Sequence, residues 1–516
     1  MDSIWKNKTE ELKGLKQAVW QAGGQNKIEK QHAAGKLTAR ERIALLFDPD
    51  TFVELDDMMS SRATDFGMAE KRRFGDGVVT GYGKVCGRQV FVSAQDFTIC
   101  GGSLGEAHTA KICRIMDKAL AVKAPIVFLN DSGGARIEEG VDGLSGLGEI
   151  FLRHTAASGV IPQISVVLGP CVGGTSYSSA LSDFVFMVNH TGSMYITGPS
   201  VVKSVIGETV SSQELGGADI HTEKSGTAHF VYEDDASCIA GVRALLAYLP
   251  QNDEEQPPRQ QGTEVDTCDR LADLIPGDPR KAYDVRTVIT CFADADSFFE
   301  VQPVFAPNMV VGFARLSGKT IGIVANQSTY LAGAIDLNAS DKAARFIRFC
   351  DAFNIPLLTL VDVPAFFPGR EQEHHGIIRH GAKMLYAYAE AQVPKVTLIM
   401  RKAYGGAFIA MNSKGMGADT VYAWPIAEIA VMGASGAIPI ICRNEIAASA
   451  DPKAATQQLC ESYDRRFLNP YIAAQHGYID DVILPEETRY RIKSAFDMLE
   501  GKVKHYPGKK HGSIPL

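Results

Sequence analysis

The sequence predicts an α/β protein made of two diverged copies of one unit in tandem. From residue 78 to about 248, short apolar runs alternate with helical patterns, which implies crossover connections between parallel strands. Landmarks of this stretch recur at an offset that is constant to within one residue, 231 from Lys111 to Lys342 and 232 from Gly173 to Gly405. Such agreement indicates an internal duplication. The recurring pairs are Ala94-Gln95 with Ala325-Asn326, Lys111 with Lys342, Asp131 with Asp362, and Gly173-Gly174 with Gly405-Gly406.

The elements of the first copy follow one another in a regular order. Residues from about 4 to 47 have a helical pattern that is broken at Gly23-Gly24, and Thr38 with Glu41 has the spacing of a capping box. The run Pro-Ile-Val-Phe-Leu at 125–129 is apolar throughout, as in a strand buried on both faces. We expect strands at 78–81, 89–94, 125–129 and 163–168 and a helix at 105–122.

Length and composition limit the domain organisation and the function classes. A chain of 516 residues is too long for one ordinary core, and the polar, Pro-rich stretch near residue 256 is typical of a linker. We expect an N-terminal domain over 1–255, a linker over 256–270 and a C-terminal domain over 271–516. The net charge of -8 argues against a nucleic-acid partner.

Targeting and metal-binding patterns are not found in the sequence. No apolar run approaches the roughly 18 residues of a membrane span, and the N-terminus does not have the layout of a signal peptide. The ten cysteines include no C-x-x-C pair, and there is no H-E-x-x-H motif. We therefore expect a cytoplasmic protein without a metal, or a mitochondrial matrix protein if a leader has been removed.

Two Gly-Gly turns, at 173–174 and 405–406, follow apolar strands and precede helix starts. Glycine lets a ligand approach the main chain closely, and free N–H groups at a helix start carry the positive end of the helix dipole. This composition suits an oxyanion hole; a single turn of this kind is more often structural, but a pair at equivalent places in two repeats favours the functional interpretation. The nucleophile elbow G-x-S-x-G does not occur, so main-chain donors are the leading hypothesis.

Two further segments leave alternatives open. The turn from Asp131 to Arg136 is Gly-rich and follows a strand. In one interpretation its amides and its arginine bind a phosphate; in the other, equally favoured, it is a simple tight turn. His374, His375 and His380 lie close together in a polar helical pattern. Lining of a pocket is favoured over metal ligation for these histidines.

At these residues the sequence resembles the carboxyltransferase subunit of biotin-dependent acyl-CoA carboxylases. The resemblance covers nearly the whole chain and includes propionyl-CoA carboxylase β, the transcarboxylase large subunit and the methylmalonyl-CoA decarboxylase α subunit. It implies two tandem crotonase-like (ClpP/crotonase) domains and a ring-shaped homo-hexamer. The motifs that carry it are GGSLGE at 101–106, DSGGARI at 131–137, GPC and GG within 169–174, GIIRHGAK at 376–383, RKAYGGA at 401–407 and KHGSIPL at 510–516.

The resemblance also implies roles for individual residues. The N-terminal half would bind acyl-CoA, and the C-terminal half of a neighbouring subunit would bind biotin. Gly173 and Gly174 would hold the thioester oxygen, whereas Gly406 and Ala407 would hold the ureido oxygen of biotin. Substrate-binding roles fall to Gly133, Gly134, Ala135, Arg136, Tyr404 and Ile409, and biotin-side positions to Phe366, Gly369, Gly405 and Phe408.

Some positions depart from the family pattern, all of them in the biotin half. Ala365 and Phe367 stand where the family usually has Gly and Leu, and His374-His375 replaces an aromatic-Gly pair. Ile409 stands where propionyl-CoA carboxylases commonly have an aspartate, and an apolar residue is more like the transcarboxylase and decarboxylase members. The carboxyl acceptor or substrate in this half is therefore expected to be unusual for the family.

The chain has no Met-Lys-Met biotinylation site, so biotin is expected on a separate carrier protein or subunit. The leading hypothesis is CO2 transfer between carboxybiotin and a short acyl-CoA, propionyl- or methylmalonyl-CoA, with a biotin carrier and a biotin carboxylase as partners. A second hypothesis is the α subunit of a sodium-pumping methylmalonyl-CoA decarboxylase, which would work with a membrane subunit. A third, of another class, is a biotin-independent crotonase-like hydratase or isomerase, which would need a pair of carboxylates such as Glu138 and Glu139.

Overall fold

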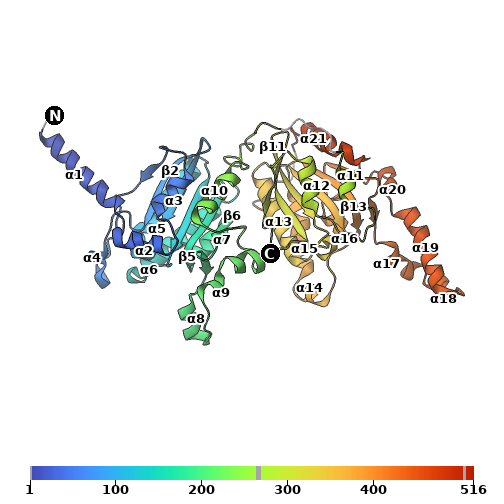
Figure 1. The fold of residues 1–516 in the computed structure, drawn as a ribbon, viewed down its shortest axis with the longest axis horizontal. Coiled ribbons are helices and arrows are strands. Elements are labelled where there is room, and N and C mark those ends of the chain that lie inside the picture. The colour runs from blue at the N-terminus through green and yellow to red at the C-terminus, as the bar shows by residue number, and fades with distance from the viewer. Residues whose placement is uncertain (1–2, 263–268, 504–506) are drawn as a thin grey trace. The chain divides into compact units, whose positions relative to one another are not determined.

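The two halves of the chain form two mixed β-sheets with the same strand order. The computed structural model describes residues 3–262, 269–503 and 507–516, and the chain divides into unit 1, Met1–Gln256, and unit 2, Pro257–Leu516. Part of the expected linker, 263–268, lies outside the described residues. In the described part of each unit the sheet has eight strands, ordered β1-β2-β3-β4-β5-β6-β8 with β7 on β5, and β9-β10-β11-β12-β13-β14-β16 with β15 on β13 (Figure 1).

The strands beyond the first hairpin of each sheet are parallel, and helices connect them. In unit 1 the strands are β1 (Val53–Leu55), β2 (Val78–Val85), β3 (Arg88–Gln95), β4 (Ile126–Ser132), β5 (Gln163–Val172), β6 (Phe184–Val188), β7 (Ser193–Tyr195) and β8 (Phe230–Tyr232). In unit 2 they are β9 (Phe299–Val301), β10 (Met309–Leu316), β11 (Lys319–Asn326), β12 (Leu357–Val363), β13 (Lys395–Tyr404), β14 (Thr420–Ala423), β15 (Glu428–Ala430) and β16 (Asp481–Val482).

The helices repeat between the units as well, and the capping box expected from Thr38 to Glu41 is confirmed at the start of α3. In unit 1 the helices are α1 (Ser3–Trp20), α2 (Gln25–Ala33), α3 (Ala39–Leu46), α4 (Met68–Lys71), α5 (Glu106–Ala121), α6 (Val141–Ala157), α7 (Gly174–Leu181), α8 (Pro199–Ile206), α9 (Ser212–Gly216) and α10 (Asp235–Leu246). In unit 2 they are α11 (Leu271–Leu274), α12 (Val285–Phe292), α13 (Leu337–Ala352), α14 (Arg370–His374), α15 (Ile377–Glu390), α16 (Gly405–Ala410), α17 (Ala434–Ile441), α18 (Arg443–Ala448), α19 (Pro452–Phe467), α20 (Tyr471–Gln475) and α21 (Thr488–Met498). Within the described residues, none of these helices combines the length and apolar character that crossing a bilayer requires.

The predicted α/β duplication is confirmed, down to the level of single contacts. The turn after β4 pairs with an upstream segment through a parallel bridge from Leu104 to Ala135, and the turn after β12 does so from Ile335 to Phe366. The central strand pair has a register shift after Asn130 in unit 1 and after Val361 in unit 2. These features keep the 231-residue offset, so the two units share strand register as well as strand order.

The duplication extends beyond the region that the sequence indicated. In unit 1 the hairpin turn at 86–87 donates its two N–H groups to the Asp48 carboxylate, at 3.1 and 2.8 Å. Arg243 on α10 also contacts that carboxylate, at 2.9 Å. The counterparts in unit 2 are Asp294, the turn at 317–318 and Arg489 on α21, at 3.0, 2.7 and 2.7 Å. The repeated unit therefore includes α3 and α10 in the first copy and α12 and α21 in the second.

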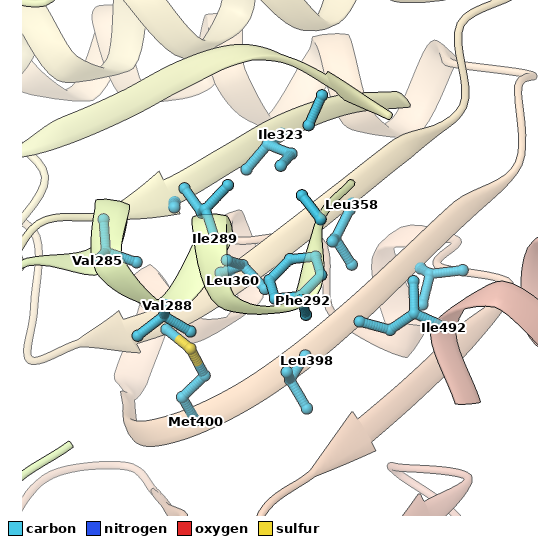
Figure 2. Close-up of a cluster of buried hydrophobic side chains, with 14 of the residues drawn as sticks. Val285, Val288, Ile289, Phe292, Ile323, Leu358, Leu360, Leu398, Met400 and Ile492 are labelled. Carbon is cyan, nitrogen blue, oxygen red and sulfur yellow. The ribbon is translucent and has the colours of Figure 1, made fainter. Parts of the chain in front are cut away.

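The core of unit 2 shows how amphipathic helices cover its sheet. Helix α12 buries side chains at i, i+3, i+4 and i+7, the spacing of one helical face. Figure 2 shows this face against side chains of the central strands and of α21. The residues of the cluster that are labelled there are Val285, Val288, Ile289, Phe292, Ile323, Leu358, Leu360, Leu398, Met400 and Ile492.

Candidate active site

The turn after β5 in unit 1 presents main-chain donors at the start of α7. Gly173 has φ 65°, a region that favours glycine, and its N–H donates to the Tyr195 carbonyl of β7 at 3.0 Å. The next two residues, Gly174 and Thr175, open the helix. Among the described residues their N–H groups meet no acceptor, as expected for the first turn of a helix. The donors available to a ligand are therefore at Gly174 and Thr175, whereas the amide of Gly173 holds β5 to β7.

The equivalent turn in unit 2 follows β13 and opens α16. Gly405 has φ 57° and corresponds to Gly173. Gly406 is exposed, and a methyl group added to it would meet no atom of the described protein within 4 Å. Ala407 is buried, at 1% exposure. The main chain at Gly406 therefore faces open space, and its N–H group has no acceptor within the described part of the protein.

A second turn lies beside the first in unit 1. Gly134 has φ 95°, and a Cβ at this position would lie 3.0 Å from the Val172 carbonyl oxygen at the end of β5. The N–H groups of Gly133 and Gly134 donate to the Gly101 carbonyl and to the Ser132 hydroxyl, at 2.9 and 3.1 Å. The N–H of Ala135 has no acceptor among the described residues. This turn therefore offers the amide of Ala135, next to the turn that offers Gly174.

In unit 2 the residue equivalent to Gly134 is Ala365. It is not among the residues with a positive φ, so the departure from glycine costs no backbone strain. Phe366 corresponds to Ala135, and its N–H likewise has no acceptor in the described ranges. Its ring packs against the Cα of Gly381 on α15, where an added Cβ would lie 3.1 Å from the ring. Gly369 is exposed and precedes α14 with φ 139°.

Arg136 lies at the edge of this site, but its guanidinium is held inside the protein. It is 1% exposed and forms ion pairs of 2.8 Å with Asp76 and with Glu139. It also donates to the Ser103 carbonyl at 2.8 Å. The predicted contact with a ligand phosphate would require breaking these bonds, so this arginine shapes the turn.

A cleft of about 410 Å³ lies next to the turn and carries other cations. Its cationic walls are Lys27 on α2, Lys71 on α4 and Arg73, and Cys100, Glu70 and Glu138 also line it. Lys71 pairs with Glu138 at 3.6 Å. The sequence analysis did not identify these three cations, because they come from two separate segments without a motif. They outnumber the two carboxylates, so the cleft remains suitable for phosphate groups.

Unit 2 lacks the segment that carries the cations Lys71 and Arg73. Residues 56–77 connect β1 to β2 in unit 1, whereas only residues 302–308, which include no lysine or arginine, connect β9 to β10. Cys100 corresponds to Leu331 at the 231-residue offset. Val304 and Leu331 are both partly exposed, at 48% and 44%. The two units therefore offer chemically different surfaces at equivalent places in one fold.

The remaining predicted site residues lie at the end of β13, in α16 and in α15. The Tyr404 hydroxyl donates to Glu428, and burial, together with this carboxylate, raises the pKa of Tyr404 well above its ordinary value. Ile409 is 47% exposed and Phe408 is half-buried. His380 contacts Asp341 at 2.7 Å, and among the described residues no three His, Cys, Asp or Glu side chains are grouped to hold a metal ion.

Two units of this strand order, each with glycine turns at the start of a short helix, define an enzyme with tandem crotonase-like domains. A family model described as the carboxyl transferase domain matches residues 30–514. The methylmalonyl-CoA decarboxylase subunit alpha of Propionigenium modestum is 54% identical over 517 residues, with all of both chains covered. A putative propionyl-CoA carboxylase beta chain of Bacillus subtilis is 57% identical, with 96% of this chain and 97% of the relative covered.

A solved structure is also similar to this chain over nearly its whole length. The transcarboxylase 12S structure, determined with methylmalonyl-coenzyme A and methylmalonic acid bound, has a TM-score of 0.96 and 50% sequence identity, and 98% of each chain is covered. The chain belongs to the carboxyl transferase family, in the group that includes propionyl-CoA carboxylase beta chains and methylmalonyl-CoA decarboxylase alpha subunits. It is an acyl-CoA carboxyltransferase.

Proposed function

We propose that the chain transfers a carboxyl group between biotin, carried by another polypeptide, and the α-carbon of propionyl-CoA or methylmalonyl-CoA. The names of the relatives support this substrate pair. The observation that carries the assignment of sides is the difference in charge between equivalent surfaces of the two units. Lys71 and Arg73 lie in the segment 56–77 of unit 1, whereas the much shorter connection 302–308 of unit 2 includes no lysine or arginine, so the phosphate-bearing substrate belongs to unit 1.

In unit 1 the cleft beside the Gly134 turn would hold coenzyme A. Lys27, Lys71 and Arg73 would contact its phosphates, since ammonium and guanidinium groups are the usual phosphate partners. The acyl thioester would then extend along the turn toward the amides of Ala135 and Gly174. Arg136 would hold the backbone of the turn in place through its bonds to Asp76 and Ser103.

The chemistry requires stabilisation of a negative thioester oxygen. When the α-carbon loses CO2, or loses a proton before it attacks CO2, charge moves onto that oxygen, and the N–H groups of Ala135 and Gly174 would donate to it. One main-chain donor of this kind is typically worth about 2.7–4 kcal/mol. The N–H of Thr175 is a further donor at the same helix start. The positive end of the helix dipole lies there and also stabilises negative charge.

In unit 2 the residues present fit biotin. The Gly406 main chain faces open space, and the amides of Phe366 and Gly406 correspond to the donor pair of unit 1. When bound, biotin supplies or accepts the carboxyl group. The N–H groups of Gly406 and Ala407 would hold its ureido oxygen, and Phe366, Gly369 and Phe408 would line its ring. This makes the site of unit 2 a second oxyanion hole.

We propose a hexamer in which neighbouring copies complete the site, because the similar transcarboxylase 12S is a hexamer assembly. Helices α8 and α17 follow β7 and β15 at equivalent places, and both expose apolar side chains. Val205 is 74% exposed and Ile440 is 67% exposed. Such exposed apolar groups beside a catalytic turn are typical of an interface.

The carboxylating direction, with a biotin carrier and a biotin carboxylase as partners in the cytoplasm, is our leading proposal. The decarboxylating direction is the second candidate, because the decarboxylase alpha subunit of Propionigenium modestum matches the entire chain. Partner subunits separate the two candidates. Co-purification with a biotin carboxylase supports the first, and co-purification with a membrane-embedded subunit supports the second.

A substitution at Gly406 tests the proposed function. Because nothing lies within 4 Å of an added Cβ there and φ is not positive, Gly406→Val should fold normally and place its side chain over the biotin site. Gly415→Val is the control, since its Cβ meets only the Ser413 hydroxyl at 4.0 Å. With free biotin and methylmalonyl-CoA, Gly406→Val should lose transfer by at least about 100-fold while coenzyme A binding persists. Unchanged turnover in Gly406→Val would contradict the assignment.

A further inference from the structure

Helix α7, which presents Gly174, is fixed by hydroxyl groups along its length. The Ser178 hydroxyl lies 2.6 Å from His154 on α6, and the Ser179 hydroxyl lies 3.0 Å from Ser165 on β5. The Ser176 hydroxyl donates to the Cys171 carbonyl at 2.7 Å. The counterpart α16 has the sequence GGAFIA and contains no hydroxyl. The polar attachment is therefore specific to unit 1.

The contacts around His154 determine which of its ring nitrogens carries the proton. The Gln163 side-chain amide donates to the His154 carbonyl at 3.0 Å, so its oxygen, 2.8 Å from Nδ1, is an acceptor. Nδ1 therefore carries the proton, and Nε2 accepts from the Ser178 hydroxyl. His154 is completely buried, and burial lowers its pKa to about 4. The imidazole is thus neutral and keeps this role at neutral pH.

A helix of eight residues has little stability of its own, so tertiary contacts determine its position. Ser178 is at position i+4 from Gly174, so these two residues lie on one face of the helix, about one turn apart. Leu147 of α6 also packs against Gly174, where an added Cβ would lie 2.7 Å from the leucine side chain. Helix α6 thus fixes α7 at both places, by an apolar contact at the donor and a hydrogen bond one turn later.

We propose that His154 and Ser178 are positioning residues for the acyl-CoA side of the transfer, holding α7 so that the Gly174 N–H points at the thioester oxygen. This inference rests on the proposed function, because it presumes that Gly174 is a donor there. The hydrogen bond acts on the transition state more than on coenzyme A binding, since the phosphates are held elsewhere, at Lys27, Lys71 and Arg73. The expected signature is therefore a lower kcat at an unchanged KM.

The test compares Ser178→Ala, Ser178→Thr and His154→Gln with the control Thr155→Ala. Thr155 is exposed, and its hydroxyl donates to the Phe151 carbonyl of the same helix. Turnover of methylmalonyl-CoA with free biotin is measured, together with the KM of each substrate and the melting temperature. Ser178→Ala should lower kcat roughly 10- to 100-fold, with both KM values within about twofold of wild type. Ser178→Thr keeps the hydroxyl and should restore most of the activity, and Thr155→Ala should match wild type.

Several outcomes would overturn the inference while leaving the proposed function intact. These are an unchanged kcat in Ser178→Ala and His154→Gln, or a loss in Ser178→Thr equal to that in Ser178→Ala. A loss that appears only in the KM for methylmalonyl-CoA would do the same. If Ser178→Ala does not fold, the comparison of His154→Gln with Thr155→Ala decides by the same criterion. A wild-type protein with no biotin-dependent turnover would instead refute the proposed function, and this inference with it.

Discussion

Replacement of Lys36 by methionine should destabilise unit 1 strongly. Its partner Asp131 is the next-to-last residue of β4, and the Asp131 carboxylate is completely buried. The Lys36 ammonium lies 2.9 Å from that carboxylate, and Arg42 also lies 2.9 Å from it. Arg42 is shared with the carboxylate of Asp235 at 2.7 Å, so two buried acids are balanced by two cations.

Removal of Lys36 leaves two buried carboxylates and one guanidinium. Leaving a buried charge uncompensated typically costs about 3–5 kcal/mol. The Gln31 amide still donates to Asp131 at 2.9 Å, which places the expected loss near the lower limit, about 3 kcal/mol. The double variant Lys36→Met with Asp131→Asn removes one charge of each sign. It should therefore cost less than the sum of the two single variants by roughly 1–3 kcal/mol.

Urea unfolding followed by circular dichroism, at one fixed protein concentration, measures these differences. Lys30→Met is the matched control, because Lys30 lies on α2, just before the loop that carries Lys36, and is exposed. It should change the free energy of unfolding by no more than about 0.5 kcal/mol. A loss below about 1 kcal/mol in Lys36→Met would refute the reasoning, as would strict additivity in the double variant.

The remaining predictions concern substrate recognition and pH. Replacing Lys71 and Arg73 together by alanine should raise the KM for methylmalonyl-CoA roughly tenfold or more while kcat with saturating substrate changes little; a fall in kcat alone would contradict their role as phosphate contacts. Ile409→Asp should alter the relative rates with acetyl-, propionyl- and butyryl-CoA, and identical ratios would remove this residue from the acyl pocket. For His154, burial lowers the pKa from 6.5 to about 4, so the unfolded chain binds the proton more readily between these pH values. The contribution of neutral His154 to the free energy of unfolding, about 3 kcal/mol, is fully present above pH 6.5 and is lost as pH falls toward 4. His154→Gln should therefore make the urea midpoint depend less on pH over this range. An unchanged dependence of the midpoint on pH would show that another group governs acid unfolding.

The sequence was sufficient to predict the duplication, because the strands and turns that carry it keep one spacing. Its extent was underestimated for a physical reason. Asp48 and Asp294 have the same contacts in the two units but are 246 residues apart, whereas their turns, at 86–87 and 317–318, are 231 apart. Segments of different length therefore precede β2 and β10. A comparison at one fixed offset cannot find the outer helices.

The predicted site illustrates the limit of motif reasoning. The Gly-rich turn ending at Arg136 correctly indicated a loop beside the cleft, but the side chain points inward because Asp76, 60 residues away, neutralises it. The amide of Gly173 is likewise used by Tyr195, so the available donor moves to Gly174. Backbone hydrogen bonding between distant segments decides both results, and it has no local sequence pattern.

The cations of the cleft could not be found from the sequence for a related reason. Lys27 belongs to α2 and Lys71 to α4, and only the folded chain brings both to the turn at Cys100. Isolated lysines on polar helices are ordinary surface residues in most proteins. Comparison of the repeats supplies the missing signal, because the segment with Lys71, between β1 and β2, is much longer than the connection between β9 and β10 in the second copy.

The differences between the copies separate what the fold requires from what each ligand requires. Both copies have a buried aspartate near the end of the equivalent strand, β4 or β12, and each neutralises it, Asp131 by Lys36 and Arg42 from the loop after α2 and from α3, and Asp362 by Arg401 at 2.8 Å. The need for a counter-charge is therefore common to both copies, while its source has diverged. By contrast, the cations of the cleft and the hydroxyl groups of α7 have no counterparts among the described residues of unit 2, and neither is needed to form the sheet that both units share. Contacts that survive duplication in altered form are most simply explained by stability, and those present in one copy alone by the ligand of that copy.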